Sequence, residues 1–463
     1  MVSGDQLQRL VREAGLENDP EAQKLLKAAA DTENQHLRQQ IKKRLEQKAA
    51  QKTQHPFNEN TPKNSPLNSI YLGNTQHQDR VYTLKEEQLT QHILTTGQSG
   101  AGKTTLFYNL MTQLSSSFWA FDRKQDYRHL TNQIDDLLVL PWKQLKLNPL
   151  KPPPGVTPDR WNNIFSIIFS QSFNLLTGSE GFLTTAVSEL YIKYNLYQED
   201  PDSYPSLYDL TNLVKSDEIS VGPASANYKD RVYWRLHPVL MTVGEIFDCS
   251  QGYPIEDLIQ RNVVFEIGGL NRNLQRFLQQ ILFAKTYEYL LAQGLRDKGL
   301  QLVLFADEAK QLFSVYLERQ DASGIPEIDD MLAKARQMGL STVAADQEPT
   351  KLTDSLKANT KTKILLPVAD QKQFQAISES MNLDRRQRDY AKRLDTGEAI
   401  IQAGNDEPVP VDLLNYQVEQ DVDDDKLREQ QMSKWKDLDY TERETRGNYY
   451  AGNSEKDTSL EDF

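Results

Sequence analysis

The sequence predicts an α/β fold with a mostly parallel sheet. Short apolar runs with the length of buried strands alternate with longer stretches whose apolar residues recur at three- and four-residue spacing. That alternation is typical of strands separated by helices. One short run, Ile93-Leu94, leads directly into a glycine-rich loop and a helical stretch. With 463 residues and 38% hydrophobic content, the chain is long enough for one large or two ordinary cores.

Residues 1–66 are predicted to form an N-terminal helix and a polar linker. Residues 20–50 have the pattern of one long polar helix with a single apolar stripe. Such a helix is either a solvated helix that packs weakly against other copies of this chain or a docking helix for a partner protein, and the sequence leaves both alternatives open. Residues 51–66 are rich in Asn, Gln, Thr and Pro, which is typical of a flexible linker.

The main α/β domain is predicted over residues 67–415, beginning with a short hairpin over 71–84. From Gly97 to Thr104 the chain reads Gly-Gln-Ser-Gly-Ala-Gly-Lys-Thr, a complete phosphate-binding loop. Glycines let successive backbone N–H groups curl round a β-phosphate, and the next helix points its positive end at the same anion. A chance glycine-rich turn is the alternative, but the strand–loop–helix context favours a nucleoside triphosphate site.

The loop residues are assigned separate tasks in this prediction. Lys103 is expected to reach the β- and γ-phosphates, and the Thr104 hydroxyl to bind Mg²⁺. The residues predicted to bind the nucleotide are Gly97, Gln98, Ser99, Gly100, Ala101, Gly102, Lys103, Thr104 and Thr105.

The hydrolytic half of the site is predicted at the end of the apolar run 302–306. Two carboxylates, Asp307 and Glu308, follow this run. Asp307 is expected to hold the Mg²⁺ shell opposite Thr104, and Glu308 to orient and polarise the attacking water. Strands often end in solvated acids, so two carboxylates alone are weak evidence for a catalytic site. Together with the phosphate loop earlier in the chain, they become strong evidence for one.

A third strand, residues 341–345, leads into Gln347. Ligands of open α/β sheets lie beyond the carboxyl ends of the strands, so an amide at that edge is well placed to sense a γ-phosphate. The alternative for Gln347 is a polar strand terminus before the turn at Pro349.

An α-helical insertion is predicted over about 150–258, where four stretches carry apolar residues at helical spacing. A strand at 263–267 and an amphipathic helix at 274–291 then return to the sheet, and strands at 363–367 and 398–402 complete it. Residues 416–463 are predicted to form an acidic, mobile tail. Its aromatic residues could dock when a partner or a neighbouring subunit is present; they are Trp435, Tyr440, Tyr449 and Tyr450.

Charge and composition narrow the class of protein. The net charge is −13, and residues 417–463 hold 14 acids against 7 bases, so the tail contributes −7 of it. Because a nucleic-acid partner needs basic residues only where the protein contacts phosphates, the acidic remainder neither supports nor excludes DNA. Cys249 is the only cysteine, so no internal disulfide is expected. No membrane span or signal peptide is recognised, and a cytoplasmic location is expected.

Several segments together resemble the HerA–FtsK superfamily. Within it, they are most similar to HerA-like helicases and type IV secretion ATPases. The resemblance implies a RecA-like ATPase that binds ATP and Mg²⁺, forms a hexameric ring, and translocates DNA or, in some branches, other polymers. It also identifies Arg336 with the family's arginine finger, which reaches a neighbouring subunit's site; a solvated helix arginine is the alternative. The segments lie within 68–412 and are 98–105, 118–127, 148–156, 307–309, 335–347, 361–364 and 394–401.

The chain departs from the pattern of the HerA–FtsK superfamily outside this region. HerA helicases carry an N-terminal β-barrel, whereas no strand-rich stretch precedes Tyr71 here. Neither the membrane spans nor the DNA-reading winged helix of FtsK-type proteins is recognisable. The resemblance is therefore to the motor domain and not to a whole protein.

Two classes of function are expected, and a third class has less support from the sequence. The first is a ring-forming DNA translocase or helicase of HerA type that works with a nuclease or another effector. The second is a type IV secretion or conjugation ATPase that moves protein or nucleoprotein substrates, and the third is a nucleotide-switched scaffold. DNA contacts in the first class are expected from loop residues that follow the strands, with solvated loop charges as the alternative; the candidates are Arg123, Lys124, Lys310 and Arg319.

Overall fold

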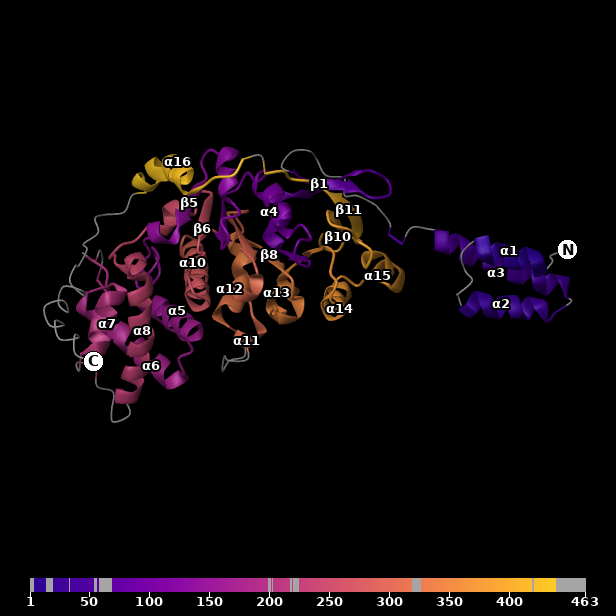
Figure 1. Ribbon diagram of the computed structural model, residues 1–463. Coiled ribbons are helices and arrows are strands. Elements are labelled where there is room, and N and C mark those ends of the chain that lie inside the picture. The colour runs from indigo at the N-terminus through magenta and orange to yellow at the C-terminus, as the bar shows by residue number, and fades with distance from the viewer. Residues whose placement is uncertain are drawn as a thin grey trace, which may run out of the picture. The chain divides into compact units, whose positions relative to one another are not determined.

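The computed structural model describes two compact units. One comprises Met1–Asn58 with Arg385–Tyr390, and the other comprises Glu59–Asp384 with Ala391–Phe463. Figure 1 shows both units along the chain. The described residues are 4–13, 20–32, 34–53, 56–57, 69–198, 201, 203–216, 219, 225–318, 326–418 and 420–438.

The smaller unit is a bundle of short helices. The bundle is formed by α1 (Gly4–Glu13), α2 (Pro20–Ala30) and α3 (Gln35–Thr53). The unit also includes most of α15 (Arg385–Ala391), where the Tyr390 ring centroid lies 5.4 Å from that of Phe57. The prediction of one long helix over 20–50 was wrong, because Asn34 starts a new helix: its Oδ1 accepts from His36 N at 3.0 Å. Of the predicted apolar stripe Leu37, Ile41 and Leu45, the last two are buried in a core shared with Leu7, whereas Leu37 is exposed.

The larger unit is built on one 11-stranded sheet, in the order β2-β1-β11-β10-β9-β3-β8-β7-β4-β6-β5. Neighbours from β9 to β5 pair in parallel, and the pairs from β2 to β9 are antiparallel. The predicted mostly parallel α/β fold is confirmed. The strands are β1 (Ser69–Thr75), β2 (Val81–Lys85), β3 (Ile93–Thr96), β4 (Phe118–Asp122), β5 (Leu138–Pro141), β6 (Val263–Glu266), β7 (Leu302–Asp307), β8 (Leu340–Asp346), β9 (Thr362–Leu365), β10 (Glu398–Gln402) and β11 (Val409–Leu413).

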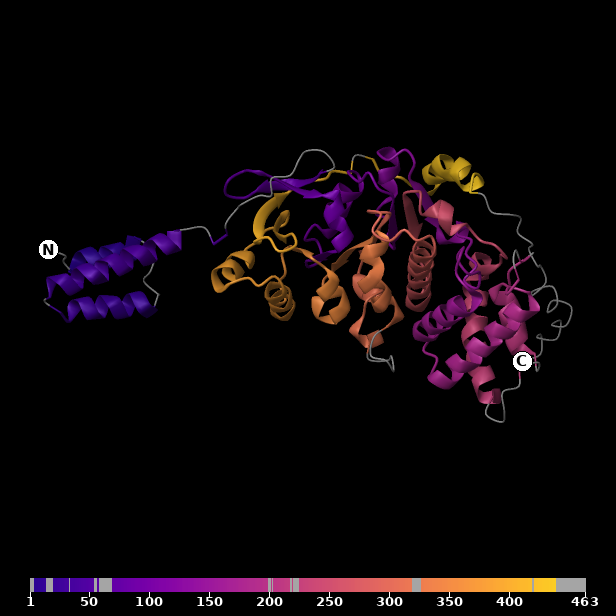
Figure 2. The same cartoon turned by 180° about the vertical axis from the view of Figure 1, so that it is seen from behind.

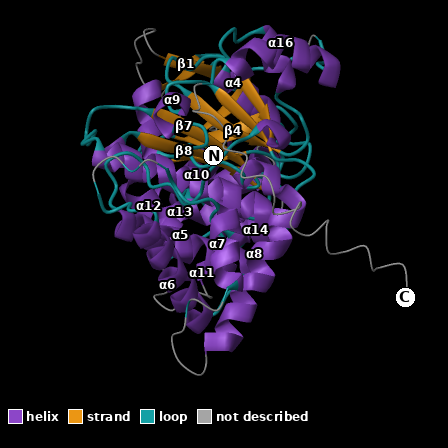
Figure 3. Ribbon diagram, turned by 90° about the vertical axis from the view of Figure 1, so that its left-hand side faces the viewer, coloured by secondary structure: helices purple, strands orange, loops and turns teal. Residues whose placement is uncertain are grey.

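Helices cover both faces of the sheet, so the central strands are buried on both sides. Along β7, Val303 and Phe305 belong to the core that α4 (Lys103–Met111) shares, whereas Leu302 and Leu304 belong to the core on α10 (Arg272–Ala292). Alternate side chains of a strand point to opposite faces, which explains why these strands are continuously apolar. Figure 3 shows the strands with helices stacked against them.

The helical insertion lies where the spacing predicts it and extends the core at the β5 end of the sheet (Figures 1 and 2). Its helices are α5 (Pro158–Phe173), α6 (Thr177–Lys193), α7 (Leu207–Lys215), α8 (Ser225–Phe247) and α9 (Ile255–Leu258). The remaining helices of the unit are α11 (Val315–Glu318), α12 (Glu327–Ala335), α13 (Asp354–Asn359), α14 (Gln371–Ser380) and α16 (Asp424–Lys436). Within the described residues, we find no helix with the length and apolarity that a bilayer crossing requires.

Helix α16 lies inside the segment predicted to be a mobile tail, and it closes the outer edge of the sheet. The buried Gln431 side chain accepts from Val139 N at 3.0 Å and donates to Leu137 O at 3.1 Å, as a neighbouring strand would. Trp435 Nε1 donates to Val139 O at 2.8 Å, so this aromatic residue docks within its own chain. Tyr440, Tyr449 and Tyr450, together with residues 439–463, lie outside the described residues.

His92, the residue directly before β3, is buried and forms hydrogen bonds with the backbone of two other segments. His92 Nδ1 accepts from Thr342 N at 3.1 Å, so Nε2 carries the proton toward Leu332 O at 3.3 Å. Burial lowers the pKa of His92 from 6.5 to about 4; the Leu332 carbonyl opposes the shift and Arg336 adds to it. The neutral imidazole is therefore the form that the fold accommodates.

This pKa predicts a loss of stability in mild acid. Below pH 6.5 the unfolded chain takes up a proton that the folded His92 refuses, so stability present above pH 6.5 is lost as the pH falls toward 4. Relative to His92→Gln, the free energy of unfolding of the wild type should fall by up to about 3 kcal/mol more over this window. Denaturant unfolding at several pH values measures it. Parallel curves for the two proteins would mean that His92 does not titrate in this range.

Candidate functional site

The glycine-rich loop between β3 and α4 has the backbone shape of an anion cradle. Gly100 and Gly102 adopt φ values of +76° and +98°, a left-handed region that favours glycine. A Cβ on Gly97 would lie 2.8 Å from the Leu366 Cβ, so the loop also passes too close to β9 for a larger residue. Gly102 caps α4 without a side chain, which leaves the first N–H groups of the helix directed at the loop.

The loop is held between the strands on either side of β3. Gly97 N donates to Asp346 O at 3.3 Å, at the end of β8. On the other side Gln98 N donates to Pro367 O at 2.9 Å, and the Gln98 side chain accepts from Ala369 N at 3.0 Å. These bonds fix the loop at the carboxyl edge of the sheet.

Lys103 begins α4 and folds back over the loop. Its Nζ donates to Gly97 O at 2.9 Å and to Gln98 O at 2.7 Å, and the residue is 8% exposed. Burial lowers the pKa of Lys103, whereas the nearby carboxylates of Asp307 and Asp346 oppose that shift. The ammonium therefore lies at the point where the loop meets the ends of β7 and β8.

The predicted metal ligand Asp307 and the predicted catalytic Glu308 follow each other at the end of β7. Burial raises the pKa of Asp307, and both the N–H of Glu308, 3.0 Å from Asp307 Oδ1, and the Lys103 charge lower it. Glu308 has φ 55° and ψ 55°, a left-handed conformation that is uncommon outside glycine. The structure thus brings Lys103 and Asp307 together, as predicted.

An unpredicted partner holds Glu308. Arg123, directly after β4, forms an ion pair through Nη1 with Glu308 Oε2, and its Nη2 lies 3.4 Å from Asp307 O. Because β4 and β7 are adjacent parallel strands, their ends meet at the same edge. The strand order was the missing information, since no local pattern in the sequence pairs positions 123 and 308.

A second group of charges surrounds the end of β8. The buried Asp346 carboxylate accepts from Lys310 N at 2.9 Å, and Lys310 Nζ donates to Glu348 Oε2 at 2.7 Å. Gln347 is exposed between these two acids, one residue beyond the strand that pairs with β3. Its position at the carboxyl edge suits a sensor, and that role stays a prediction.

The basic residues predicted to contact DNA differ in whether an acidic side chain already pairs with them. Arg123 and Lys310 are engaged with acidic partners. Lys124 is exposed, and Arg319 lies outside the described residues.

Arg336 lies at the opposite edge of the sheet. It precedes β8, whereas the phosphate loop follows β3, and these two strands run parallel. Seven strand residues span roughly 20 Å, so the exposed Arg336 side chain cannot reach the phosphate loop of its own chain. It lines a cavity of about 530 Å³ together with His92, Asn359 and Lys361.

Comparison with known proteins identifies the fold. No family model and no curated protein matches the chain. The structure is similar to that of VirB4 from Thermoanaerobacter pseudethanolicus, with 16% identity, a TM-score of 0.59, and coverage of 79% of this chain and 100% of that chain. It is also similar to the plasmid coupling protein TrwB in complex with ADP and Mg²⁺, with 17% identity, a TM-score of 0.55, and coverage of 73% and 89%.

The same protein, TrwB, has also been solved with an ATP analogue, and this structure has 16% identity, a TM-score of 0.55, and coverage of 79% of this chain and 98% of that chain. At these identities the likeness concerns the fold. The RecA-like fold of P-loop ATPases, which the sequence resemblance implies, is confirmed.

Proposed function

We propose that this chain is an ATP-hydrolysing motor of the HerA–FtsK superfamily. The observation that carries the proposal is the meeting of the glycine cradle, Lys103 and the Asp307–Glu308 pair at one edge of the sheet. Phosphate recognition and hydrolysis need these groups together, because phosphoryl transfer depends on positioning and charge stabilisation.

The donor set fits a magnesium nucleotide. Thr104 and Asp307 offer hydroxyl and carboxylate oxygens, the ligands that Mg²⁺ prefers, and the backbone N–H groups at the start of α4 suit phosphates. Mg²⁺ would supply charge neutralisation at the phosphate oxygens when bound. The complexes of the similar protein TrwB with ADP and Mg²⁺ and with an ATP analogue support ATP and Mg²⁺ as the cofactors here.

Each residue then has a defined task. Lys103 exchanges the carbonyls of Gly97 and Gln98 for phosphate oxygens, which restores its hydrogen bonds. Glu308 orients and polarises the attacking water when its carboxylate faces the γ-phosphate. Gln347, at the neighbouring strand end, senses that phosphate through its amide.

We further propose that the active unit is a ring, with a hexamer as the family's arrangement. Arg336 cannot serve its own phosphate loop because it lies at the amino edge of β8. An exposed arginine there completes the site of a neighbouring subunit, as an arginine finger does in trans.

The transported polymer is proposed to be DNA, in a HerA-type translocase or helicase that works with a nuclease or another effector. The alternative is a type IV secretion or conjugation ATPase that moves protein or nucleoprotein substrates. The fold similarity to VirB4 and to the plasmid coupling protein TrwB supports keeping this second candidate.

ATP hydrolysis stimulated by DNA separates the two candidates. For a DNA translocase, turnover should rise when duplex or single-stranded DNA is added, and DNA affinity should fall with salt at a log–log slope of about −0.9 per phosphate contact on duplex. Filter binding and phosphate release across a salt series measure both. ATP turnover that is unaffected by DNA, in a protein that does not bind it, would favour the secretion-type candidate.

Replacing Glu308 by Gln should slow ATP hydrolysis by about 10²-fold or more, the usual contribution of a positioned general base. Binding of ATP should persist, because Lys103, Thr104 and Asp307 remain. Single-turnover phosphate release, with a fluorescent nucleotide to measure affinity, tests both parts. If Glu308→Gln hydrolyses ATP at the wild-type rate, another residue activates the water.

A further inference from the structure

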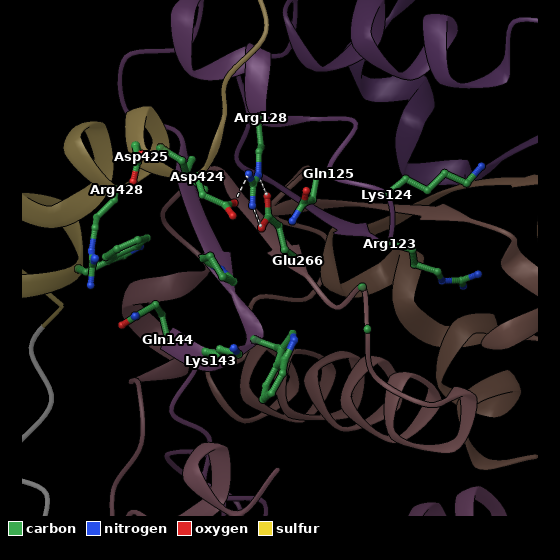
Figure 4. A pocket seen from close by; sticks show the side chains of 16 residues that line it. Arg123, Lys124, Gln125, Arg128, Lys143, Gln144, Glu266, Asp424, Asp425 and Arg428 are labelled. Atoms are coloured by element: carbon green, nitrogen blue, oxygen red, sulfur yellow. Dashed lines mark hydrogen bonds and ion pairs between the residues drawn. The ribbon is translucent and has the colours of Figure 1, made fainter. Parts of the chain in front are cut away.

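A second cavity lies beside the catalytic edge and is shown in Figure 4. It has a volume of about 590 Å³ and lies beyond the ends of β4, β5 and β6, with α16 as one wall. Arg428 lies on one side of it, Lys143 lies below its centre, and Arg123 and Lys124 lie on the other side (Figure 4). Two indoles, Trp142 and Trp435, also line it.

Five basic side chains line the cavity together with three carboxylates, those of Glu266, Asp424 and Asp425, so the lining carries an excess of positive charge although the whole chain has a net charge of −13. One of its arginines is already neutralised: the buried Arg128 donates from Nη2 to Glu266 Oε2 at 2.8 Å and from Nη1 to Asp424 Oδ1 at 2.6 Å. Lys124 and Arg428 are exposed, and Lys143 Nζ lies 5.5 Å from the Trp142 ring centroid. These cations are available to an anionic ligand.

Arg123 connects this cavity to the hydrolytic residues. It lines the large cavity and also a small one that Asp307 and Glu308 border. Its side chain is 16% exposed and pairs with Glu308, and its Nε is buried with no hydrogen-bond partner among the described residues. An anion that entered from the large cavity could therefore compete with Glu308 for the same guanidinium.

The ion pair has a consequence for hydrolysis. Glu308 must direct its carboxylate at the attacking water, and a carboxylate bound by an arginine is not free to do so. An Arg–carboxylate contact is also geometrically specific, so it fixes the direction of the Glu308 side chain as well as its charge. Any ligand that takes over Arg123 would release Glu308.

We propose that Arg123 is a positioning residue that holds Glu308 in an inactive arrangement, and that a single-stranded segment of nucleic acid in the adjacent cavity releases it. Phosphates suit Lys124, Lys143 and Arg428, and bases can stack on the accessible parts of the half-buried Trp142 and Trp435 indoles. The inference rests on the proposed ATPase function and adds to it a ligand site and a coupling between that site and hydrolysis.

The coupling is tested with Arg123→Gln and its charge-preserving control Arg123→Lys. Without nucleic acid, Arg123→Gln should hydrolyse ATP about fivefold faster than the wild type, a change of about 1 kcal/mol that matches the strength of such an ion pair. Its KM for ATP should be unchanged, and an oligothymidylate should add little further stimulation. Arg123→Lys should restore both the low basal rate and the stimulation, which a merely structural role would not predict.

Further variants test where the ligand binds and whether Arg123 acts through Glu308. Arg428→Gln should raise the oligothymidylate concentration needed for half-maximal stimulation, whereas Arg231→Gln, an exposed arginine on α8, should not. The double variant Arg123→Gln/Glu308→Gln should lose the gain in rate, because Arg123 acts through Glu308. If Arg123→Gln fails to fold, Arg123→Met keeps the aliphatic stem and removes the same charge.

The outcomes separate the inference from the proposed function. A wild type that hydrolyses ATP faster than Lys103→Ala, together with an Arg123→Gln variant no faster than the wild type, overturns the inference and leaves the ATPase intact. Hydrolysis by neither wild type nor Arg123→Gln overturns the proposed function and the inference with it. Stimulation of the wild type by an acidic polypeptide but not by oligothymidylate shows that the ligand class is wrong.

Discussion

Lys103→Ala should abolish ATP hydrolysis, with a loss of about 10³-fold or more. Removing one positioned donor to a developing charge costs roughly 10²- to 10³-fold, and Lys103 also neutralises the phosphates in the ground state. Its Nζ donates to the carbonyls of Gly97 and Gln98, so it already lies at the loop that receives the phosphates. Steady-state phosphate release measures the rate, and nucleotide affinity should fall in parallel.

The control for Lys103→Ala is Lys372→Ala, which removes an exposed lysine from α14 and should keep wild-type turnover. Thermal unfolding of both variants checks that each one folds. Turnover near the wild-type rate in a folded Lys103→Ala variant would overturn the assignment of residues 97–104 as the phosphate loop.

Arg336→Ala should reduce ATP hydrolysis by about 10³-fold or more, the usual contribution of an arginine finger, although it touches no residue of its own phosphate loop. The reason is that Arg336 completes a site in the next subunit. Mixing inactive Arg336→Ala subunits with inactive Lys103→Ala subunits should therefore restore part of the activity, because some intact loops then lie beside intact arginines. Phosphate release across a range of mixing ratios, with mass measurement of the oligomers, shows the effect.

The matched control mixes Lys103→Ala with Glu308→Gln subunits. The structure places both residues at one site of one chain, so no mixed ring contains a complete site and the mixture should stay inactive. If the Arg336→Ala mixture also stays inactive although mixed oligomers form, either Arg336 acts within its own subunit or hydrolysis requires every site of the ring to be intact.

Much of the site could be predicted because its signals are local. The phosphate loop needs glycines where φ is positive, at Gly100 and Gly102, and a lysine at the start of the next helix. The end of β7 carries its two carboxylates directly after a buried run. In each case the residues that act together lie within a few positions of one another in the sequence. The pattern can therefore be recognised without knowledge of the fold.

The pairings between distant strands could not be predicted in this way. The ion pair of Arg123 with Glu308 depends on β4 and β7 being neighbours. The acidic composition of the tail hid α16, whose Gln431 is buried by bonding to the backbone of β5.

The sequence by itself determined the α/β class, the phosphate loop and the acidic pair, because backbone conformation and strand burial follow from short-range patterns. Only the tertiary structure decided which strand ends meet, that Arg123 reaches Glu308, and that Arg336 lies at the edge away from its own phosphate loop. Those relations depend on the order in which parallel strands assemble, and that order is set by the packing of helices on both faces of the whole sheet rather than by any single segment.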